Sequence, residues 1–277
     1  MGIKTVKNLL TTYGLTPSKS LGQNFLIDGN IVKKILDVSN PLKNDVILEI
    51  GPGMGNLTSE LSKRVKKIIA IEKDEKMCII LKSLNLKNVD IVHNDILKVD
   101  FNKEIPKKYK VIANIPYYLT SKLIRRLLES ENRPSSITLM IQKEVAERIC
   151  KIKEKSNLLS LSVWFYAKPE IQFFVSKNSF YPKPKIDSAI IKITPHKTRE
   201  SKEFNESFFK IIKAGFSHPR KQLINNFAEK FEKEKEEIKE WLIDNNISPN
   251  QRAEEINLDS WVNLTKNKKI PFFKKKG

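Results

Sequence analysis

Three of the chain's nine glycines fall within five residues, and this cluster is the strongest single constraint on the fold. Val46–Ile50 is an apolar run that contains the acid Glu49, and the turn Gly51-Pro52-Gly53-Met54-Gly55 follows it directly. Glycine reaches positive φ without strain and lets a ligand approach the backbone closely. The pattern therefore predicts a buried strand that opens onto a nucleotide-sized ligand.

The size and charge of the chain narrow its class. Its 277 residues can bury a full core and suggest one large domain with a smaller companion. The 51 Lys and Arg against 32 Asp and Glu give a net charge of +19. A Lys-rich genome explains part of this excess, and the remainder favours a polyanionic partner, with nucleic acid preferred over a membrane surface.

The cysteines and the apolar runs indicate the compartment. Cys78 and Cys150 have no metal-ligand spacing and are expected to be reduced core residues. No apolar run approaches membrane-spanning length, and the N-terminus has no signal-peptide core. We therefore expect a cytoplasmic protein that needs neither a metal ion nor a membrane.

Apolar runs alternate with helical patterns from residue 46 to residue 153. The expected strands are Val46–Ile50, Lys67–Glu72, Val89–His93, Tyr109–Ala113 and Ser136–Gln142. The expected helices between and after them are Asn56–Val65, Lys73–Leu84, Thr120–Ser130 and Lys143–Lys153. This alternation predicts an α/β fold with a parallel sheet covered on both faces.

The pattern changes in the last part of the chain. Further strands are expected at Leu159–Ala167, Ile171–Ser176 and Ser188–Ile193, with an antiparallel pair at one edge of the sheet. After Pro195 only helical patterns follow, at residues 203–216, 220–231 and 233–246. We expect a large domain of residues 1–195 and a small helical domain of residues 196–277. Before the sheet, Asp28 is the expected N-cap of a helix that ends at Val38.

A second acid completes the expected nucleotide site. Glu72 lies 21 positions after Gly51, the spacing of a carboxylate that accepts hydrogen bonds from ribose hydroxyls. A nicotinamide enzyme would place its third glycine at position 56, where this chain has Asn56, so a pyrophosphate at the helix start is disfavoured. Glu49 instead suits a ligand with a cationic methionine end. These residues predict a site for S-adenosylmethionine.

The glycines of this turn and Asp95 each have an alternative, purely structural interpretation. A glycine turn without a ligand is the alternative for Gly51, Gly53 and Gly55, and the acid at Glu72 makes it less favoured. Asp95 follows the third expected strand, and its carboxylate would accept the exocyclic amine of adenine. An Asn-Asp pair after a strand is, however, often only a turn.

The segment Asn114-Ile115-Pro116-Tyr117 follows the fourth expected strand, at the edge where open α/β sheets bind ligands. The Asn114 side-chain carbonyl and a backbone carbonyl of the next two residues would accept both N–H bonds of a planar amine. Tyr117 offers a face for stacking, and Pro116 stiffens the loop. Methyl transfer would then be an in-line displacement that depends on positioning and needs no strong general base. In isolation the tetrapeptide would be read as an ordinary turn.

The chain resembles the ribosomal small-subunit RNA adenine N6,N6-dimethyltransferases over about residues 19–259. The motifs that carry the resemblance are Gln23-Asn24-Phe25-Leu26, Glu49-Ile50-Gly51-Pro52-Gly53, Glu72, Asn94-Asp95, Asn114-Ile115-Pro116-Tyr117, residues 180–188, residues 216–223 and Arg252-Ala253-Glu254. The resemblance implies a Rossmann-like, seven-stranded class I methyltransferase sheet with a small C-terminal all-α domain. It also implies a monomer that dimethylates two adjacent adenines near the 3′ end of 16S rRNA in an assembling small subunit.

The same resemblance implies roles for individual residues. Asn24 and Leu26 would line the cofactor site. The residues implied to contact S-adenosylmethionine are Gly51, Gly53, Glu72, Asp95 and Asn114. The implied catalytic set is Asn114, Pro116, Tyr117 and Phe180. Within it, Tyr117 and Phe180 would sandwich the target adenine, because an extruded base needs aromatic faces. Without the resemblance, Phe180 would be read as a core residue beside a proline turn.

Basic side chains in two segments are candidate RNA contacts. They are Lys143, Arg148 and Lys151, in a run that continues to Lys153 and Lys155, together with Arg220 and Lys221. A solvated helix face is the alternative for the first run. The family often has two consecutive arginines before a lysine in the helical domain, whereas this chain has His218-Pro219-Arg220-Lys221, which weakens the expected docking role of that segment.

Two other functions share the core motifs. An erythromycin-resistance-type methylase would modify one adenine of large-subunit rRNA, and Arg252-Ala253-Glu254 with Asn257-Leu258 favours the small-subunit family instead. A catalytically idle, nucleic-acid-binding relative is also conceivable, but here the loop from Asn114 to Tyr117 and the cofactor acids are intact. We therefore expect an active methyltransferase.

Overall fold

A computed structural model describes residues 2–18, 20–151 and 156–267. The chain forms two compact units: the first comprises Met1–Glu147 and Ala167–Pro195, and the second comprises Arg148–Tyr166 and His196–Gly277. One change of unit falls after Pro195, where we expected a domain boundary, whereas residues 148–166, which we expected in the first domain, belong to the second unit. None of the helices in the described part of the chain combines the length and apolar character needed to span a bilayer.

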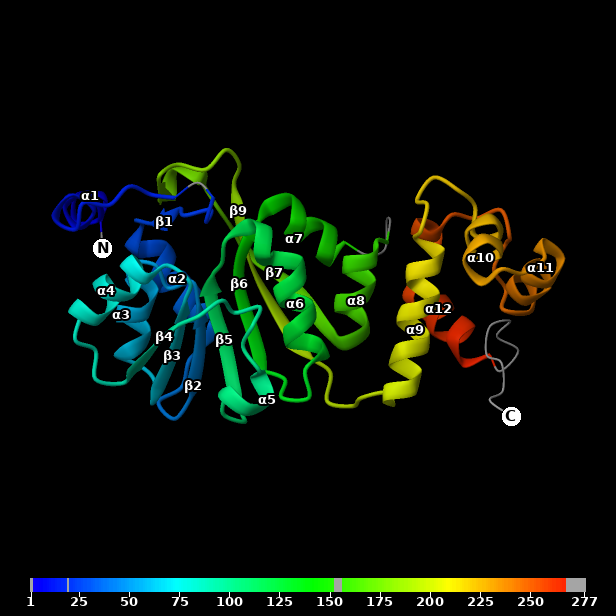
Figure 1. Ribbon diagram of the computed structural model, residues 1–277, viewed down its shortest axis with the longest axis horizontal. Coiled ribbons are helices and arrows are strands. Elements are labelled where there is room, and N and C mark those ends of the chain that lie inside the picture. The colour runs from blue at the N-terminus through cyan, green and yellow to red at the C-terminus, as the bar shows by residue number, and fades with distance from the viewer. Residues whose placement is uncertain (1, 19, 152–155, 268–277) are drawn as a thin grey trace. The chain divides into compact units, whose positions relative to one another are not determined.

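A seven-stranded sheet forms the centre of the first unit (Figure 1). Its strand order is β4-β3-β2-β5-β6-β9-β7, and all neighbours are parallel except that β9 runs antiparallel to both β6 and β7. The strands are β2 (Val46–Ile50), β3 (Lys67–Glu72), β4 (Val89–His93), β5 (Tyr109–Asn114), β6 (Ser136–Gln142), β7 (Ala167–Val175) and β9 (Ser188–Pro195). The five parallel strands expected from the sequence are confirmed.

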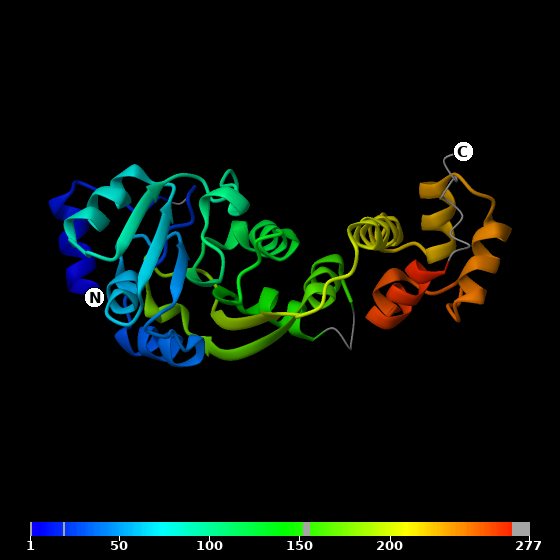
Figure 2. The ribbon, with the colours of Figure 1, turned by 90° about the horizontal axis from the view of Figure 1, so that it is seen from below.

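The direction of the strand order reverses between β2 and β5. Crossovers between parallel strands are right-handed, so connections that run in opposite directions along the sheet place their helices on opposite faces. Figures 1 and 2 show helices on both sides of the sheet. These helices are α2 (Gly29–Ser39), α3 (Asn56–Ser62), α4 (Glu75–Ser83), α5 (Phe101–Glu104), α6 (Thr120–Glu129) and α7 (Lys143–Cys150). The carboxyl ends of β2 and β5 therefore form a crevice at the reversal point, which is where such sheets bind ligands.

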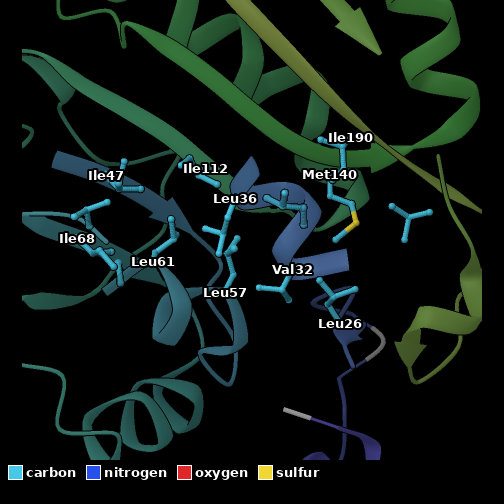
Figure 3. Close-up of a cluster of buried hydrophobic side chains, with 14 of the residues drawn as sticks. Leu26, Val32, Leu36, Ile47, Leu57, Leu61, Ile68, Ile112, Met140 and Ile190 are labelled. Atoms are coloured by element: carbon cyan, nitrogen blue, oxygen red, sulfur yellow. The ribbon is translucent and has the colours of Figure 1, made fainter. Parts of the chain in front are cut away.

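The core on one face of the sheet comes from alternate strand residues and two amphipathic helices. Val32 and Leu36 of α2, together with Leu57 and Leu61 of α3, are buried against the sheet. Figure 3 shows these side chains beside Ile47, Ile68, Ile112, Met140 and Ile190. The Asp28 carboxylate accepts a hydrogen bond from the Asn30 N–H at the start of α2, which confirms Asp28 as its N-cap.

A short two-stranded sheet joins the N-terminal segment to the chain before β9. Strand β1 (Phe25–Leu26) pairs antiparallel with β8 (Phe180–Tyr181), so that Leu26 lies opposite Phe180. The N-terminal helix α1 (Ile3–Thr12) buries Val6 and Leu10 in a cluster with Phe25 and Met54. The 3₁₀ turns η1 (Tyr117–Leu119) and η2 (Lys177–Ser179) complete this unit.

The second unit is all-helical. It contains α8 (Leu158–Tyr166), α9 (Lys202–Gly215), α10 (Leu223–Phe231), η3 (Ala253–Glu255), α11 (Lys235–Asp244) and α12 (Leu258–Lys266). The Phe165 ring of α8 stacks on Phe208 of α9 with centroids 4.1 Å apart, and Tyr166 stacks on Phe209 at 5.5 Å. This aromatic packing explains why α8 belongs to the second unit.

One expected strand, Leu159–Ala167, and one expected turn, at Lys168-Pro169-Glu170, are wrong. Leu158–Tyr166 is helix α8, because the Asn157 side chain accepts hydrogen bonds from the N–H groups of Leu159 and Ser160 and thereby caps a helix. Strand β7 then continues through Pro169, which we expected to lie in a turn. Since β7 is the edge strand, one side of its backbone has no partner strand, and a proline that lacks the N–H is tolerated there.

Candidate active site

A pocket of about 180 Å³ opens at the carboxyl ends of β2, β3 and β5 in the first unit. It is lined by every residue predicted for the cofactor and target sites, namely Asn24, Leu26, Gly51, Gly53, Glu72, Asp95, Asn114, Pro116, Tyr117 and Phe180. The topology explains this convergence, because the motifs follow adjacent parallel strands and reach one edge of the sheet. The structure therefore brings the predicted residues together, while their individual roles stay predictions.

The glycine turn after β2 forms one wall of the pocket. Gly51 and Gly53 have φ values of +64° and +56°, in the left-handed region that favours glycine. A Cβ at Gly51 would lie 3.5 Å from the Pro116 ring, and one at Gly53 would lie 3.3 Å from the Phe25 ring. Glycine is thus favoured at both positions by the left-handed backbone, and a side chain at position 53 would also crowd the Phe25 ring.

The Glu72 carboxylate at the end of β3 is held by three backbone donors. The Gly53 N–H donates to Oε2 at 3.0 Å, and the N–H groups of Lys73 and Asp74 donate to Oε1 at 2.8 and 2.9 Å. Burial raises the pKa of Glu72, and these hydrogen bonds oppose the shift. A carboxylate has about four acceptor positions, so one position remains for a ligand hydroxyl. These three bonds therefore fix the orientation of the Glu72 side chain at the rim of the glycine turn before any ligand binds.

A second carboxyl group, that of Glu49, lies beneath the pocket. Glu49 is 1% exposed, and its Oε2 atom has no hydrogen-bond partner within the described part of the chain. Burial raises the pKa of Glu49 to about 8; the neighbouring Thr58 hydroxyl lowers this pKa, and the charge of Glu72 raises it further. An unpartnered buried acceptor in a ligand pocket is suited to a cationic ligand group, because such a group supplies both the missing donor and the opposite charge.

Asp95 lies at the far side of the pocket, after β4. Its Oδ1 accepts the Leu97 N–H at 2.9 Å, and its Oδ2 lies 3.0 Å from Lys73 Nζ. The hydrogen bond from Leu97 and the charge of Lys73 hold the pKa of Asp95 below its ordinary value. Asp95 is therefore an ionised acceptor at the pocket wall, as an adenine amine would require.

The Asn114 amide is oriented by a backbone carbonyl of the N-terminal segment. Asn114 lines the pocket, and its Nδ2 donates to the Asn24 carbonyl at 3.5 Å, so the side-chain oxygen remains available as an acceptor. Asn24 itself donates from Nδ2 to the Gly22 carbonyl at 3.2 Å. The structure thus assigns to Asn24 a contact with the target loop, which the sequence did not predict.

Two aromatic residues border the same pocket. The Tyr117 hydroxyl is 2.7 Å from Ser188 Oγ, and burial raises the pKa of Tyr117. Phe180 is 4% exposed and lines the pocket while it also belongs to the buried cluster with Leu26. Its core role and its pocket role, which the sequence presented as alternatives, are therefore combined.

The candidate RNA contacts lie outside the pocket and are divided between the units. Lys143, at the start of α7, is in the first unit and places its Nζ 5.0 Å from the Phe174 ring centroid. Arg148, Lys151, Arg220 and Lys221 are exposed residues of the second unit, and Lys221 is 3.0 Å from Glu229. Lys153 and Lys155, which complete the predicted run, lie outside the described residues.

Sequence reasoning missed two supporting residues. Ser188, which contacts the Tyr117 hydroxyl, lies within the motif of residues 180–188 but was given no role. Asn56 was treated only as a departure from a dinucleotide motif, yet its side chain donates to the Leu26 carbonyl and ties the glycine turn to β1. An asparagine at position 56, where a dinucleotide motif has glycine, was a signal that this position is unusual. Its partner Leu26 is 30 positions away in the sequence, and nothing in the sequence indicated the pairing.

The strand order, the antiparallel β9 and the pocket at the reversal point define the class. They are those of a class I methyltransferase, an enzyme class whose methyl donor is of the S-adenosylmethionine type. The family model of ribosomal RNA adenine dimethylase matches residues 15–269 of the chain. The chain belongs to this family, and the resemblance inferred from its motifs is confirmed.

Similar proteins agree with this assignment. A protein of Fusobacterium nucleatum named ribosomal RNA small subunit methyltransferase A is 42% identical over 254 residues, which cover 90% of this chain and 96% of that protein. The crystal structure of a dimethyladenosine transferase from Plasmodium falciparum superposes with a TM-score of 0.69 at 26% identity, over 87% of this chain and 95% of that one. The 23S rRNA methyltransferase ErmE has a TM-score of 0.70 at 22% identity, over 87% and 98%, and shows the shared fold alone.

Proposed function

We propose that this protein transfers methyl groups from S-adenosylmethionine to N6 of two adjacent adenines in the 3′-terminal hairpin of 16S rRNA. The product is N6,N6-dimethyladenine, formed during assembly of the small subunit. The observation that carries the proposal is the convergence of Asn114, Tyr117 and Phe180 on one pocket at the edge of the sheet. The name of the Fusobacterium relative supports the small subunit as the target.

The residues of the pocket fit the proposed cofactor. Glu49 would take the methionine ammonium at its unpartnered oxygen, and Glu72 would accept a ribose hydroxyl at its remaining position. Asp95 would accept the adenine amine, and the bare backbone of Gly51 and Gly53 would permit close approach. When bound, S-adenosylmethionine supplies an electrophilic methyl group on a sulfonium. The protein's contribution is to hold the acceptor nitrogen in line with it.

The target loop explains how an aromatic amine becomes a nucleophile. An adenine amine that donates its N–H bonds to Asn114 Oδ1 and to a backbone carbonyl of the loop directs its lone pair out of conjugation. Stacking on Tyr117 holds the base, and the hydrogen bond with Ser188 fixes the position of that ring. No strong base is needed, because the proton is lost after the nitrogen becomes cationic.

The two competing functions make different demands on the chain. A large-subunit methylase shares the fold, and the likeness to ErmE at 22% identity carries no argument for that substrate. A catalytically idle relative would not need an Asn114 amide held in position. We therefore retain the small-subunit reaction, carried out by a monomer in the cytoplasm on an assembling particle.

The test uses purified protein, S-adenosylmethionine with a labelled methyl group, and both ribosomal subunits from a strain that lacks this methylation. The labelled RNA is digested to nucleosides. Labelled dimethyladenine in small-subunit RNA alone is the expected result. Label in large-subunit RNA would replace the proposal with the resistance-type reaction, and bound cofactor without transfer to either subunit would replace it with a binding role. Comparing small subunits with protein-free 16S rRNA tests the preference for an assembling particle, which equal rates would contradict.

A further inference from the structure

Tyr118 is an exposed aromatic residue at the mouth of the pocket. It lines the pocket and is nevertheless 56% exposed, the largest exposed fraction among the large apolar and aromatic side chains of the described residues. Its neighbour Tyr117 is held inside by the bond to Ser188, so the two tyrosines of η1 face different surroundings. A Cβ added to Gly22 would lie 3.6 Å from Tyr118 Cδ1, so the ring lies beside Gly22 with room for about one methyl group between them.

Another hollow, of about 410 Å³, lies along α6, the helix that begins two residues after Tyr118. It is lined by Leu97, Ser121, Lys122, Arg125, Arg126 and Glu129. Leu97 lines both the pocket and this hollow, so the two are neighbours separated by that residue. We call this second hollow the α6 groove.

One side of the α6 groove is held by hydrogen bonds, and an exposed lysine lies along the groove. The Arg126 guanidinium donates to the carbonyls of Leu97 and Val99, so it braces the loop after Asp95. Arg125 lies 2.9 Å from Glu129 and is already paired. Lys122 is exposed on the first turns of α6. A path from the pocket therefore passes an exposed aromatic face and then reaches a lysine, the combination that single-stranded RNA requires.

We propose that Tyr118 stacks the base next to the target adenine and that Lys122 contacts a phosphate of the same RNA strand in the α6 groove. This inference rests on the proposed function, in which the two substrate adenines are adjacent. While one adenine occupies the pocket, its neighbour lies one nucleotide away and meets the rim at Tyr118. Tyr118 and Lys122 thus position the substrate pair, and single-stranded RNA is the occupant of the groove.

The test is a thermodynamic cycle of binding measurements, in which the Tyr118 side chain and the neighbouring base are removed separately and together. The protein is saturated with S-adenosylhomocysteine, and fluorescent RNA strands with two adjacent adenines are titrated at low salt. In parallel strands an abasic nucleotide replaces one adenine or the other. The variants are Tyr118→Ala, Tyr118→Leu, which retains apolar contact with Gly22, and Tyr118→Phe, which retains the aromatic face.

Removal of the neighbouring base should weaken binding by the wild-type protein roughly 5- to 100-fold, the range for one stacked base. Tyr118→Ala and Tyr118→Leu should lose the same factor on intact RNA and nothing further on abasic RNA. Tyr118→Phe should behave as the wild type. If removal of the neighbouring base lowers RNA affinity by the same factor in the wild type and in Tyr118→Ala, the proposal is overturned. A wild-type protein that does not bind the RNA would also overturn it.

The lysine is tested through salt dependence. Lys122→Ala should lower the slope of log affinity against log salt by about 0.7, the contribution of one phosphate contact in a single strand. Lys43→Ala is the matched control, because Lys43 is exposed and precedes β2 at the opposite edge of the sheet. Equal slopes for Lys122→Ala and the control would refute the proposed contact between Lys122 and an RNA phosphate in the α6 groove. Because these assays measure binding, they remain informative if the methylation assay places the label in large-subunit RNA.

Discussion

The Glu49 carboxyl group shows how one residue links the stability of the fold to its ligand. It is fully enclosed beside the glycine turn, and one of its oxygens has no partner among the described residues. Burying an ionised carboxylate is costly unless it is paired, so the group takes up a proton instead. A cationic ligand group beside Glu49 would supply the missing partner and would favour loss of that proton.

The first prediction concerns pH. The pKa of Glu49 is about 8 in the folded protein against an ordinary value of 4.5, so between these values the folded state binds the extra proton. The free energy of unfolding should therefore fall as pH rises from about 5 to 8. Glu49→Gln should reduce this fall, as measured by urea denaturation across the range, whereas Glu206→Gln on the exposed surface of α9 should leave it unchanged. Parallel curves for wild type and Glu49→Gln would contradict the assignment.

The second prediction concerns Asn114. Asn114→Ala removes the acceptor for the reacting amine, and misplacement of a reacting group costs about 10²-fold in rate. Turnover should fall at least that far, while affinity for cofactor and RNA stays close to that of the wild type. Single-turnover methyl transfer and separate binding titrations measure the two quantities. Asn30→Ala, at an exposed position in the first turn of α2, is the control. Retained turnover in Asn114→Ala would exclude the proposed role.

The third prediction concerns Glu72. Glu72→Ala should weaken S-adenosylmethionine binding while the fold stays intact, although three N–H groups lose their acceptor. Glu72→Gln offers one acceptor oxygen and places an NH₂ group against these donors, so it should not rescue binding. Isothermal titration gives the affinities, and circular dichroism checks the fold. Unchanged affinity in Glu72→Ala would refute the ribose assignment.

At the scale of elements, sequence periodicity predicted the parallel strands well because each is a short apolar run that ends in a turn. It failed at α8, whose sequence from Leu158 to Tyr166 is apolar on every side and so has no helical period. The cap at Asn157 was the available signal. Helix α1 and strand β1 were also missed, because their partners, such as Met54 and Phe180, are distant in the sequence.

The fourth prediction tests the packing of α8. Phe165 stacks on Phe208 at 4.1 Å and contacts Phe209 edge-on at 5.7 Å. Since Phe165 is half-buried, Phe165→Ala should cost the second unit about 2–3 kcal/mol, somewhat less than a fully buried phenylalanine. Hydrogen exchange should show faster exchange in α9, with β2 and β3 unaffected. Equal loss of protection in β2 would indicate that α8 also stabilises the first unit.

At the scale of the whole molecule, the net charge of +19 indicated a polyanionic partner, and membership of an RNA-modifying family agrees with that expectation. Sequence motifs also identified the residues around the pocket, because each motif follows a strand and the strands share an edge. Charge alone could not identify the RNA-binding face. Exposed lysines occur throughout the chain, and the predicted contacts belong to different units.

The fifth prediction uses this charge. RNA affinity should fall steeply between 50 and 200 mM salt, by roughly 10³-fold or more if six or more phosphates are contacted. Cofactor affinity should change far less, because two of the pocket's carboxylates, Glu49 and Glu72, are buried and so are screened little by salt. Filter binding of 16S rRNA fragments and cofactor titrations over the same salt series provide the comparison. A flat salt dependence for RNA would mean that the excess charge serves another purpose.

The shared pocket wall of Gly51 and Pro116 has a thermodynamic consequence. These residues belong to the cofactor turn and to the target loop, and both line the same pocket. A displacement of this wall by one ligand changes the free energy of binding the other, and such a coupling is reciprocal. Whatever factor bound cofactor adds to the affinity for RNA, bound RNA must add to the affinity for cofactor. Loss of the methyl group would then alter both equilibria together.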